Sequence, residues 1–216
     1  MPLLTEEIKA QVRESLADLT SPVRLIVFTQ TLECAFCREN RELIESVAEL
    51  SDHITAEVYD FIVDAEKAQA YNVDKIPALI VMGEEDYGLR FYGIPAGYEF
   101  TSLIHVIRMV GGVGSQLDEA TIQSLNALTE PVHIQTFVTP TCPYCPQAVV
   151  LGYEMAYVSP MVRADAIESS EFLQLAIQYQ VAGVPRTVIN DKIHIEGVVP
   201  VGMIMEKVQE AVAAQE

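Results

Sequence analysis

The sequence has no tryptophan, only four cysteines and few basic residues. Its 13 lysines and arginines stand against 31 aspartates and glutamates, which gives a formal net charge of −18 at pH 7. A protein with this charge repels polyanions. Nucleic acids and anionic membrane surfaces are therefore poor partners for it, because binding to nucleic acid depends on cationic side chains.

Long hydrophobic runs are also missing. No stretch approaches the roughly 20 apolar residues that a membrane-spanning helix needs. The N-terminal residues lack the basic start and apolar run of a signal peptide, so we predict a cytoplasmic protein. Half of the residues are nevertheless apolar and no low-complexity tract occurs, which indicates a folded chain. Its 216 residues suit one large domain or two small ones.

The four cysteines form two C-x-x-C motifs, CAFC at residues 34–37 and CPYC at residues 142–145. No cysteine is left over for a structural disulfide elsewhere in the chain. In a cytoplasmic protein this spacing indicates redox chemistry or metal binding rather than a framework of disulfides.

The two motifs belong to an internal repeat with an offset of 108 residues. The segment YNVDKIP at 71–77 matches YQVAGVP at 179–185 with the same offset. We therefore predict two similar domains, residues 1–113 and 114–216. The glycine-rich run GGVGS, which begins at Gly111, is the expected junction between them.

Periodicity predicts the same order of elements in both halves. Helices are expected at residues 4–18, 36–50, 65–72 and 100–110, and again at 118–128, 144–153, 170–179 and 201–214. Strands are expected at 23–29, 54–62, 77–82 and 89–93, and again at 132–138, 161–167, 186–190 and 192–196. After the prolines the offset falls to 104, which pairs Gly93 with Gly197. This order predicts an α/β fold with a mixed sheet.

A strand that leads into C-x-x-C at a helix start, with a later β-branched residue and proline, resembles the thioredoxin fold. Two such units with CAFC and CPYC resemble the glutaredoxin-like protein disulfide oxidoreductases over essentially the whole chain. The resemblance implies two tandem thioredoxin-like domains, each with a central mixed β-sheet flanked by helices. It also implies a thiol–disulfide oxidoreductase, similar in plan to a minimal protein disulfide isomerase, that acts in cell redox homeostasis.

The resemblance assigns roles by motif. It implies that the attacking thiols are Cys34 and Cys142 and that the resolving thiols are Cys37 and Cys145. It further implies that the cis-prolines are Pro77 and Pro185, and that the residues whose backbone binds the substrate chain are Ile76 and Val184.

The chemistry of exchange explains why a helix start is useful. A thiolate must attack a disulfide sulfur, and a free thiol with a pKa of roughly 8.5 is mostly protonated at neutral pH. Helix N-terminal N–H groups stabilise the thiolate. In CPYC we expect Pro143 in the first helical turn, and we expect Pro146 to leave a kink or a free carbonyl near Cys142. Glu33 should raise the pKa of the Cys34 thiol, so we predict that the C-terminal site is the more reactive one.

Thioredoxins carry a buried aspartate six residues before the first cysteine, where this sequence has Phe28 and Thr136. Glu57 and Asp165 form a matched acidic pair on the second strand of each half, again 108 residues apart. One hypothesis is that they accept the proton of the resolving cysteines. The alternative is that they are solvated strand residues.

The aromatic residues inside the motifs, Phe36 and Tyr144, have two interpretations. They form an apolar platform for a substrate chain, or they merely cover the start of the helix. The first interpretation makes them candidate substrate-binding residues.

Two other functions compete with the enzyme. Four cysteines can make a structural zinc site, but 104 residues separate the pairs here, whereas zinc ribbons use about 15–20. A non-catalytic interaction module would need no second cysteine. We therefore predict exchange with disulfide-containing proteins, with no metal and no cofactor besides the two redox-active disulfides. Reductase, isomerase and oxidase share one such site. We expect a reductase fed by a thioredoxin-reductase-type flavoenzyme, with a peroxidase as one candidate acceptor.

Overall fold

A computed structural model describes residues 3–213 of the chain. The first half contains α1 (Glu6–Ser15), β1 (Val23–Thr29), α2 (Cys37–Ala48), β2 (Ile54–Asp60), α3 (Ala65–Ala70), β3 (Ala78–Met82), β4 (Leu89–Tyr92), α4 (Glu99–Arg108) and the π-helical turn η1 (Met109–Val113). The second half contains α5 (Glu119–Asn126), β5 (Val132–Val138), α6 (Cys145–Val158), β6 (Val162–Glu168), α7 (Leu173–Gln178), β7 (Arg186–Ile189), β8 (Ile193–Glu196) and α8 (Val201–Ala213).

The predicted order of helices and strands is confirmed in both halves, and the first strand of each half has the predicted bounds. Residue 214 of the last predicted helix lies outside the described residues, as do residues 1–2 and 215–216 of the two proposed domains. Within residues 3–213, no helix is both long and apolar enough to cross a lipid bilayer.

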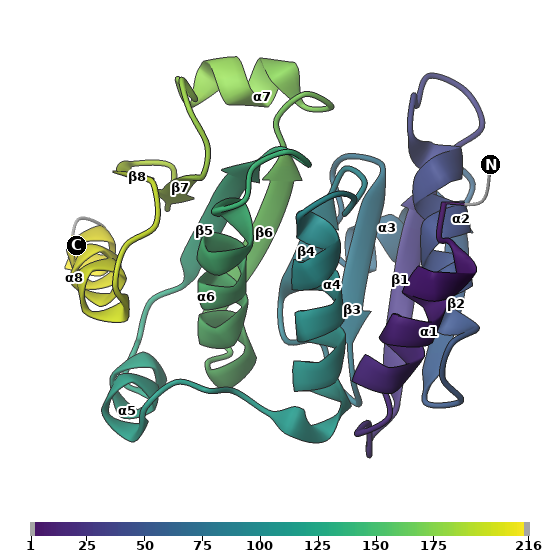
Figure 1. Ribbon diagram of the computed structural model, residues 1–216. Coiled ribbons are helices and arrows are strands. Elements are labelled where there is room, and N and C mark those ends of the chain that lie inside the picture. Colours follow the sequence, from purple (N-terminus) through teal and green to yellow (C-terminus); the bar gives the residue numbers. More distant parts are fainter. Residues whose placement is uncertain (1–2, 214–216) are drawn as a thin grey trace.

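The strands of both halves form one sheet with the order β2-β1-β3-β4-β6-β5-β7-β8 (Figure 1). Each half pairs its first two strands in parallel and its remaining strands antiparallel. A parallel pairing of β4 with β6 joins the halves. The two sheets implied by the resemblance are thus continuous with each other.

The apolar character of β4 favours its position inside the joined sheet. All four residues of β4 are buried, and they include the large side chains of Leu89, Phe91 and Tyr92. A strand of this kind is poorly suited to a solvent edge, where charged side chains and short strands prevent unwanted pairing. Its counterpart β8 has the sequence IHIE and only one buried residue, and it does lie at the free edge.

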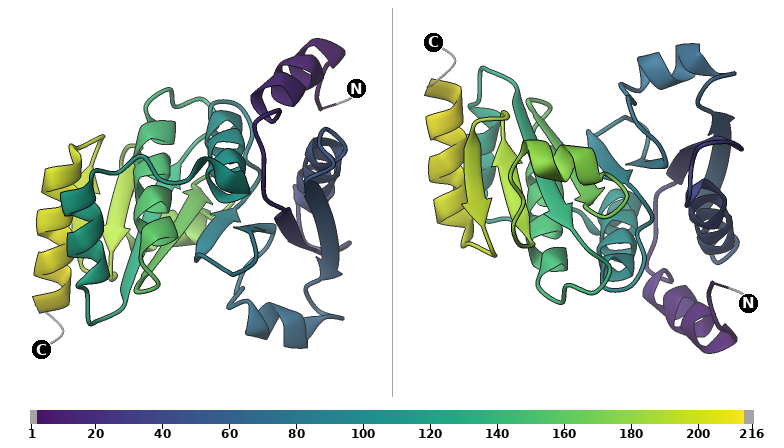
Figure 2. Two further views of the ribbon diagram at one scale, coloured as in Figure 1. Left: turned by 90° about the horizontal axis from the view of Figure 1, so that it is seen from below. Right: turned by 90° about the horizontal axis from the view of Figure 1, so that it is seen from above.

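Helices cover both faces of the sheet (Figures 1 and 2). The larger apolar core lies between the sheet and α1, α2, α4, α5, α6 and α8. A second, smaller core lies on the opposite face under α3 and α7. Consecutive residues of β1 alternate between these cores, Leu25 and Val27 in the first, Ile26 and Phe28 in the second. This is why its sequence VRLIVFT is almost entirely apolar.

The interface between the halves is packed like a core. Tyr153 of α6 meets Phe91 of β4 edge to face, with ring centroids 5.0 Å apart, and donates its hydroxyl to the Arg90 carbonyl at 2.6 Å. On the adjoining helices, His105 of α4 lies 3.1 Å from the carboxylate of Glu154 on α6. The two halves are therefore held together by side chains as well as by the sheet.

The glycine-rich run connects the halves as a π-helical extension of α4. Within it Gly112 has a φ of 120° and is followed by Gly114 with a φ of 76°, a backbone conformation that glycine adopts at low cost. The proposed boundary between residues 113 and 114 falls at the end of this turn.

The start of α4 docks against the segment that precedes the second C-x-x-C motif. The Tyr98 N–H donates to the Pro140 carbonyl at 2.9 Å. Gly97 has a φ of 61°, and a Cβ atom there would lie 2.1 Å from the same carbonyl oxygen. Only glycine allows the two segments to approach this closely.

We expect Gly97→Ala to lower the free energy of unfolding more than Gly114→Ala does. Both residues have positive φ, so the backbone conformation alone costs alanine about 1–3 kcal/mol at either position. Only at Gly97 does the new Cβ also meet a backbone carbonyl, which adds about 2 kcal/mol or more, whereas Gly114 has open space. Urea unfolding of the two variants measures the difference, and equal losses would contradict the close contact.

Candidate active site

Each C-x-x-C motif lies between a strand and the helix that follows it. Cys34 and Cys37 form one disulfide, and Cys142 and Cys145 form the other. The helices α2 and α6 begin at the second cysteine of each motif, so the first cysteine stands just outside the helix. Cys37 and Cys145 are buried, whereas Cys34 is only partly buried.

Both disulfides lie at the same edge of the sheet. Two successive antiparallel pairings make β1 and β4 run in the same direction, and β4, β6 and β5 are parallel to one another. The motifs follow the C-terminal ends of β1 and β5. Four strand spacings of about 4.8 Å separate these strands, which places β1 and β5 roughly 19 Å apart across the sheet. Exchange requires direct contact between sulfur atoms, so the two sites cannot exchange with each other in this arrangement.

Pro146, and not Pro143, occupies the first turn of the second motif's helix. Since α6 begins at Cys145, Pro143 precedes the helix and Pro146 stands at one of its first positions. The prediction for Pro143 was therefore wrong. A proline at the helix start removes an N–H group that has no intrahelical partner. The helix α6 continues to Val158, past its predicted end at residue 153.

The two prolines after the repeat segments have cis peptide bonds, Ile76–Pro77 and Val184–Pro185, as the resemblance implied. The carbonyl oxygen of Val184 lies 3.7 Å from the sulfur of Cys142. The backbone of the residue before the proline is thus next to the sulfur of the first cysteine of the motif.

A matched glycine completes each site. The Gly93 N–H donates to the Pro77 carbonyl at 2.9 Å, and the Gly197 N–H donates to the Pro185 carbonyl at 2.8 Å. Both glycines have positive φ. The offset of 104 residues, read from the sequence, therefore identifies equivalent positions in the two units.

The aromatic side chains within the motifs are exposed, Phe36 by 45% and Tyr144 by 66%. Beside the first motif, Leu32 is exposed by 74%. This exposure leaves the rings available to a substrate chain, and their role in binding it stays a prediction.

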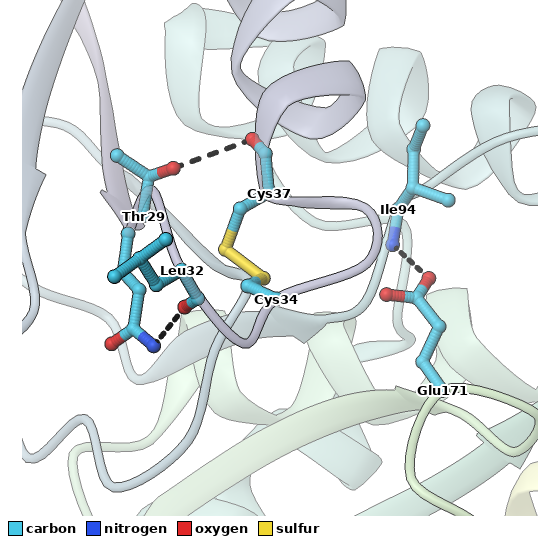
Figure 3. The surroundings of a disulfide bond; sticks show 7 residues. Thr29, Leu32, Cys34, Cys37, Ile94 and Glu171 are labelled. Atoms are coloured by element: carbon cyan, nitrogen blue, oxygen red, sulfur yellow. Dashed lines mark hydrogen bonds between the residues drawn. A yellow bond between two sulfur atoms is a disulfide. The ribbon is translucent and has the colours of Figure 1, made fainter.

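The two sites differ in the hydrogen-bond donors around the attacking sulfur. The Cys145 N–H at the start of α6 points at the Cys142 sulfur from 3.1 Å. After reduction the same N–H would stabilise a thiolate at this sulfur. At the first site the Thr29 hydroxyl donates to the Cys37 carbonyl at 3.4 Å, away from the attacking sulfur (Figure 3).

Glu57 and Asp165 lie on the sheet face opposite to α2 and α6. Arg24 donates to Glu57 at 2.7 Å and lowers the pKa of that carboxyl. Asp165 is fully buried, which favours its neutral form, but His133 and Arg163 bind it and the pKa of this carboxyl falls below its usual value. Within residues 3–213 neither carboxylate contacts a cysteine, so their role as proton acceptors stays a prediction.

A buried carboxyl that the sequence analysis missed lies on the same face as the motif helices. Glu99 opens α4, is 3% exposed and accepts the Ser102 hydroxyl at 2.8 Å. Its other oxygen has no hydrogen-bond partner within the described part of the chain. Burial raises the pKa of Glu99 to about 7, although the bond from Ser102 opposes this. The adjoining Tyr98 binds Pro140, two residues before Cys142.

The helical spacing of α4 could have identified Glu99 as a buried carboxyl. Glu99, Leu103 and Val106 fall on one stripe of α4, and a charged residue on an apolar stripe is unusual. Asn40 stands one turn after Cys37 on the buried side of α2 and is also fully buried. Its side-chain amide has no hydrogen-bond partner among residues 3–213. Polar residues at buried helix positions near a motif therefore mark groups to examine for function.

Residues 3–213 contain no group of three or more His, Cys, Asp or Glu side chains placed to hold a metal ion. The four cysteines are joined in pairs, and each pair belongs to a different half of the sheet.

Comparisons with known proteins agree with this geometry. Residues 132–210 match the thioredoxin domain family. The crystal structure of a protein disulfide oxidoreductase from Aeropyrum pernix superposes with a TM-score of 0.92 and 31% sequence identity, covering 97% of this chain and 94% of that one. These matches define a thioredoxin-fold protein with two disulfide-bearing units. The chain belongs to the protein disulfide oxidoreductase family.

Alkyl hydroperoxide reductases form a second group of relatives. The N-terminal domain of the Enterococcus faecalis enzyme has a TM-score of 0.88 and 26% identity, covering 95% of this chain and 99% of that one. An alkyl hydroperoxide reductase chain of Pseudomonas aeruginosa is 28% identical over 99% of this chain. The match covers only 39% of that curated relative, so the chain corresponds to about two fifths of it.

We expect Glu99→Gln to change how stability depends on pH. The unfolded glutamate has a pKa near 4.5 and the folded one near 7, so the native state binds more protons between these values. The stabilising contribution of the protonated form is complete below pH 4.5 and is lost as the pH rises through 7, a loss of about 3 kcal/mol. Urea unfolding at pH 5 and pH 8 should show a smaller fall for Glu99→Gln than for the parent. An unchanged fall would contradict the assignment.

We also expect the reduced protein to be alkylated at Cys142 at lower pH than at Cys34. The Cys145 N–H favours the Cys142 thiolate, while the preceding Glu33 disfavours the thiolate at Cys34. Alkylation rates of both cysteines, followed by mass spectrometry of peptides from pH 5 to pH 9, give the two apparent pKa values. A lower value at Cys34 would disprove the prediction.

Proposed function

We propose that this chain exchanges dithiols and disulfides with protein substrates at its two C-x-x-C sites. The observation that carries this proposal is the repeated arrangement of a disulfide at a helix start beside a cis X-Pro bond. The sulfur atoms of the chain are sufficient for the chemistry. The proposed reaction therefore requires no bound cofactor and no metal.

The reduced second site reacts in two steps. The Cys142 thiolate attacks one sulfur of a substrate disulfide, which forms a mixed disulfide and releases the other substrate sulfur as a thiolate that takes up a proton. Cys145 then loses its proton and attacks the Cys142 sulfur. The substrate leaves as a dithiol, and two electrons have passed from the enzyme to it. Cys34 and Cys37 follow the same course at the first site.

A proton acceptor is needed when the resolving thiol reacts. We propose Glu99 for the second site, because it lies in the helix layer of α6 and has a pKa of about 7. A carboxyl with such a pKa can take up a proton and release it again near neutral pH. Glu57 and Asp165 are charged members of ion pairs on the other face, and their participation would need intermediate groups.

We propose that the substrate chain binds beside each motif, along the cis-proline. A proline withholds the N–H group that a neighbouring strand would bind, so the edge next to the sulfur stays open. We propose that an extended substrate segment pairs there with the backbone of Ile76 or Val184. The exposed rings of Phe36 and Tyr144 would cover its apolar side chains.

We further propose that electrons flow from this chain to its substrates. A reducing cytoplasm favours this direction, and a thioredoxin-reductase-type flavoenzyme would restore the dithiols. The names of the alkyl hydroperoxide reductase relatives add a hydroperoxide-reducing protein as a candidate acceptor. Isomerase activity would use the same sites and differ in the redox state in which they are kept.

A redox titration tests the function. The protein is equilibrated in graded dithiothreitol buffers and alkylated, and the modified cysteines are counted by mass. We expect two reversible two-electron steps between roughly −180 and −300 mV, because working exchange sites fall in this range.

Two variants make the titration specific. Cys142→Ser/Cys145→Ser and Cys34→Ser/Cys37→Ser should each retain one step, since each motif forms its own disulfide. Potentials near the lower limit favour a reductase and potentials near the upper limit favour an oxidant. Cysteines that stay reduced or oxidised throughout would overturn the function.

A further inference from the structure

The first site has a wall that belongs partly to the second half of the chain. Ile94 lies in the surroundings of the Cys34–Cys37 disulfide (Figure 3), and Gly93 precedes it directly after β4. The Gly93 N–H is tied to the Pro77 carbonyl, so this wall adjoins the cis-proline.

A carboxylate from the second half binds this wall. The Ile94 N–H donates to Oε1 of Glu171 at 2.7 Å, in the loop between β6 and α7 (Figure 3). A Cβ atom at Gly93 would lie 2.5 Å from Cβ of Glu168 and 2.9 Å from Oε1 of Glu171. The loop therefore presses directly on the wall, and no side chain fits between them.

The loop that carries Glu171 is held in place by hydrogen bonds to the Glu168 carboxylate. The Glu171 N–H donates to Glu168 at 2.7 Å, and the Ser170 hydroxyl donates to the same carboxylate at 2.9 Å. Burial raises the pKa of Glu171 to about 7, the bond from Ile94 lowers it and the nearby charge of Glu168 raises it. The bond to Ile94 is thus made by a partly desolvated carboxyl in a fixed position.

The repeat provides an internal comparison. At the second site Val198 takes the place of Ile94 and is exposed by 41%. A Cβ atom at Gly197 would meet nothing within 4 Å. Among residues 3–213 no side chain accepts the Val198 N–H. The counterpart of Glu171 in the first half is Val63, which is exposed by 83%. The loop after β6 thus covers Gly93 and Ile94 at the first site, whereas no described residue covers the equivalent Gly197 and Val198 in the same way.

We propose that Glu171 is a specificity-determining residue of the Cys34–Cys37 site, which it closes on one side to extended polypeptide chains. An incoming strand binds through backbone hydrogen bonds, and the Ile94 N–H is already occupied. Both sites can still exchange with proteins, but the first site accepts protein chains less readily relative to small disulfides than the second site does, because only the first is covered on one side. This inference rests on the proposed exchange function.

The test uses the full chain with Cys142→Ser/Cys145→Ser, so that only the first site reacts. The rates with insulin and with hydroxyethyl disulfide are measured as kcat/KM, with dithiothreitol as reductant. We expect Glu171→Ala to raise the ratio of insulin to hydroxyethyl disulfide by about tenfold, since one competing hydrogen bond is removed. Glu171→Gln retains an amide oxygen that accepts the Ile94 N–H, so its ratio should stay close to that of the parent.

Two controls separate this effect from others. Val63→Ala changes the exposed counterpart of Glu171 in the first half, which does not contact Gly93 or Ile94, and should leave the ratio unchanged. In the Cys34→Ser/Cys37→Ser background, Glu171→Ala should leave the second site unchanged, which excludes general loosening of the fold. An unchanged or lower ratio in Glu171→Ala at the first site overturns the inference. If the first-site parent reduces neither disulfide, the exchange function itself fails at that site, and this is a different result.

Discussion

The parallel pairing of β4 with β6 is the interaction on which the rest of the arrangement depends. It joins two four-stranded units into one sheet and makes β1 and β5 run in the same direction. Both disulfides consequently lie at one edge. It also brings the start of α4 to the second motif and the loop after β6 to the first. Without this pairing each unit would keep its motif but lose its contacts with the other.

These contacts make the two chemically similar sites different. Each half supplies a glutamate whose pKa is raised by burial to about 7. Glu99 of the first half follows Tyr98, which binds Pro140 of the second half, and Glu171 of the second half binds Ile94 of the first. Glu99 has one oxygen without a protein partner in the described chain and is suited to proton transfer. Glu171 is bound to a backbone N–H and is suited to shaping the site. A raised pKa alone therefore does not define a role.

Local patterns predicted the elements well because burial enforces them. The apolar runs of β1 and β5 are covered on both faces, so their bounds follow from the sequence. The predictions were less accurate at helix ends, where a single backbone hydrogen bond decides at which residue the helix begins. The helix α6 begins at Cys145, which leaves Pro143 outside it. Likewise, the spacing of Glu57 and Asp165 matched in the repeat, but spacing along a strand did not reveal that they lie on the face away from the cysteines.

The sequence by itself determined the two motifs, the repeat, the strand and helix order and the positions of the prolines. These are local properties, set by residue type and by periodicity along a few turns or strands. Only the tertiary structure decided that the sheets join, that the sites share an edge, that Glu99 is buried and that Glu171 reaches the other unit. Such contacts link residues that are distant in the chain, such as Ile94 and Glu171. No local pattern encodes them, because they depend on how two buried surfaces pack together.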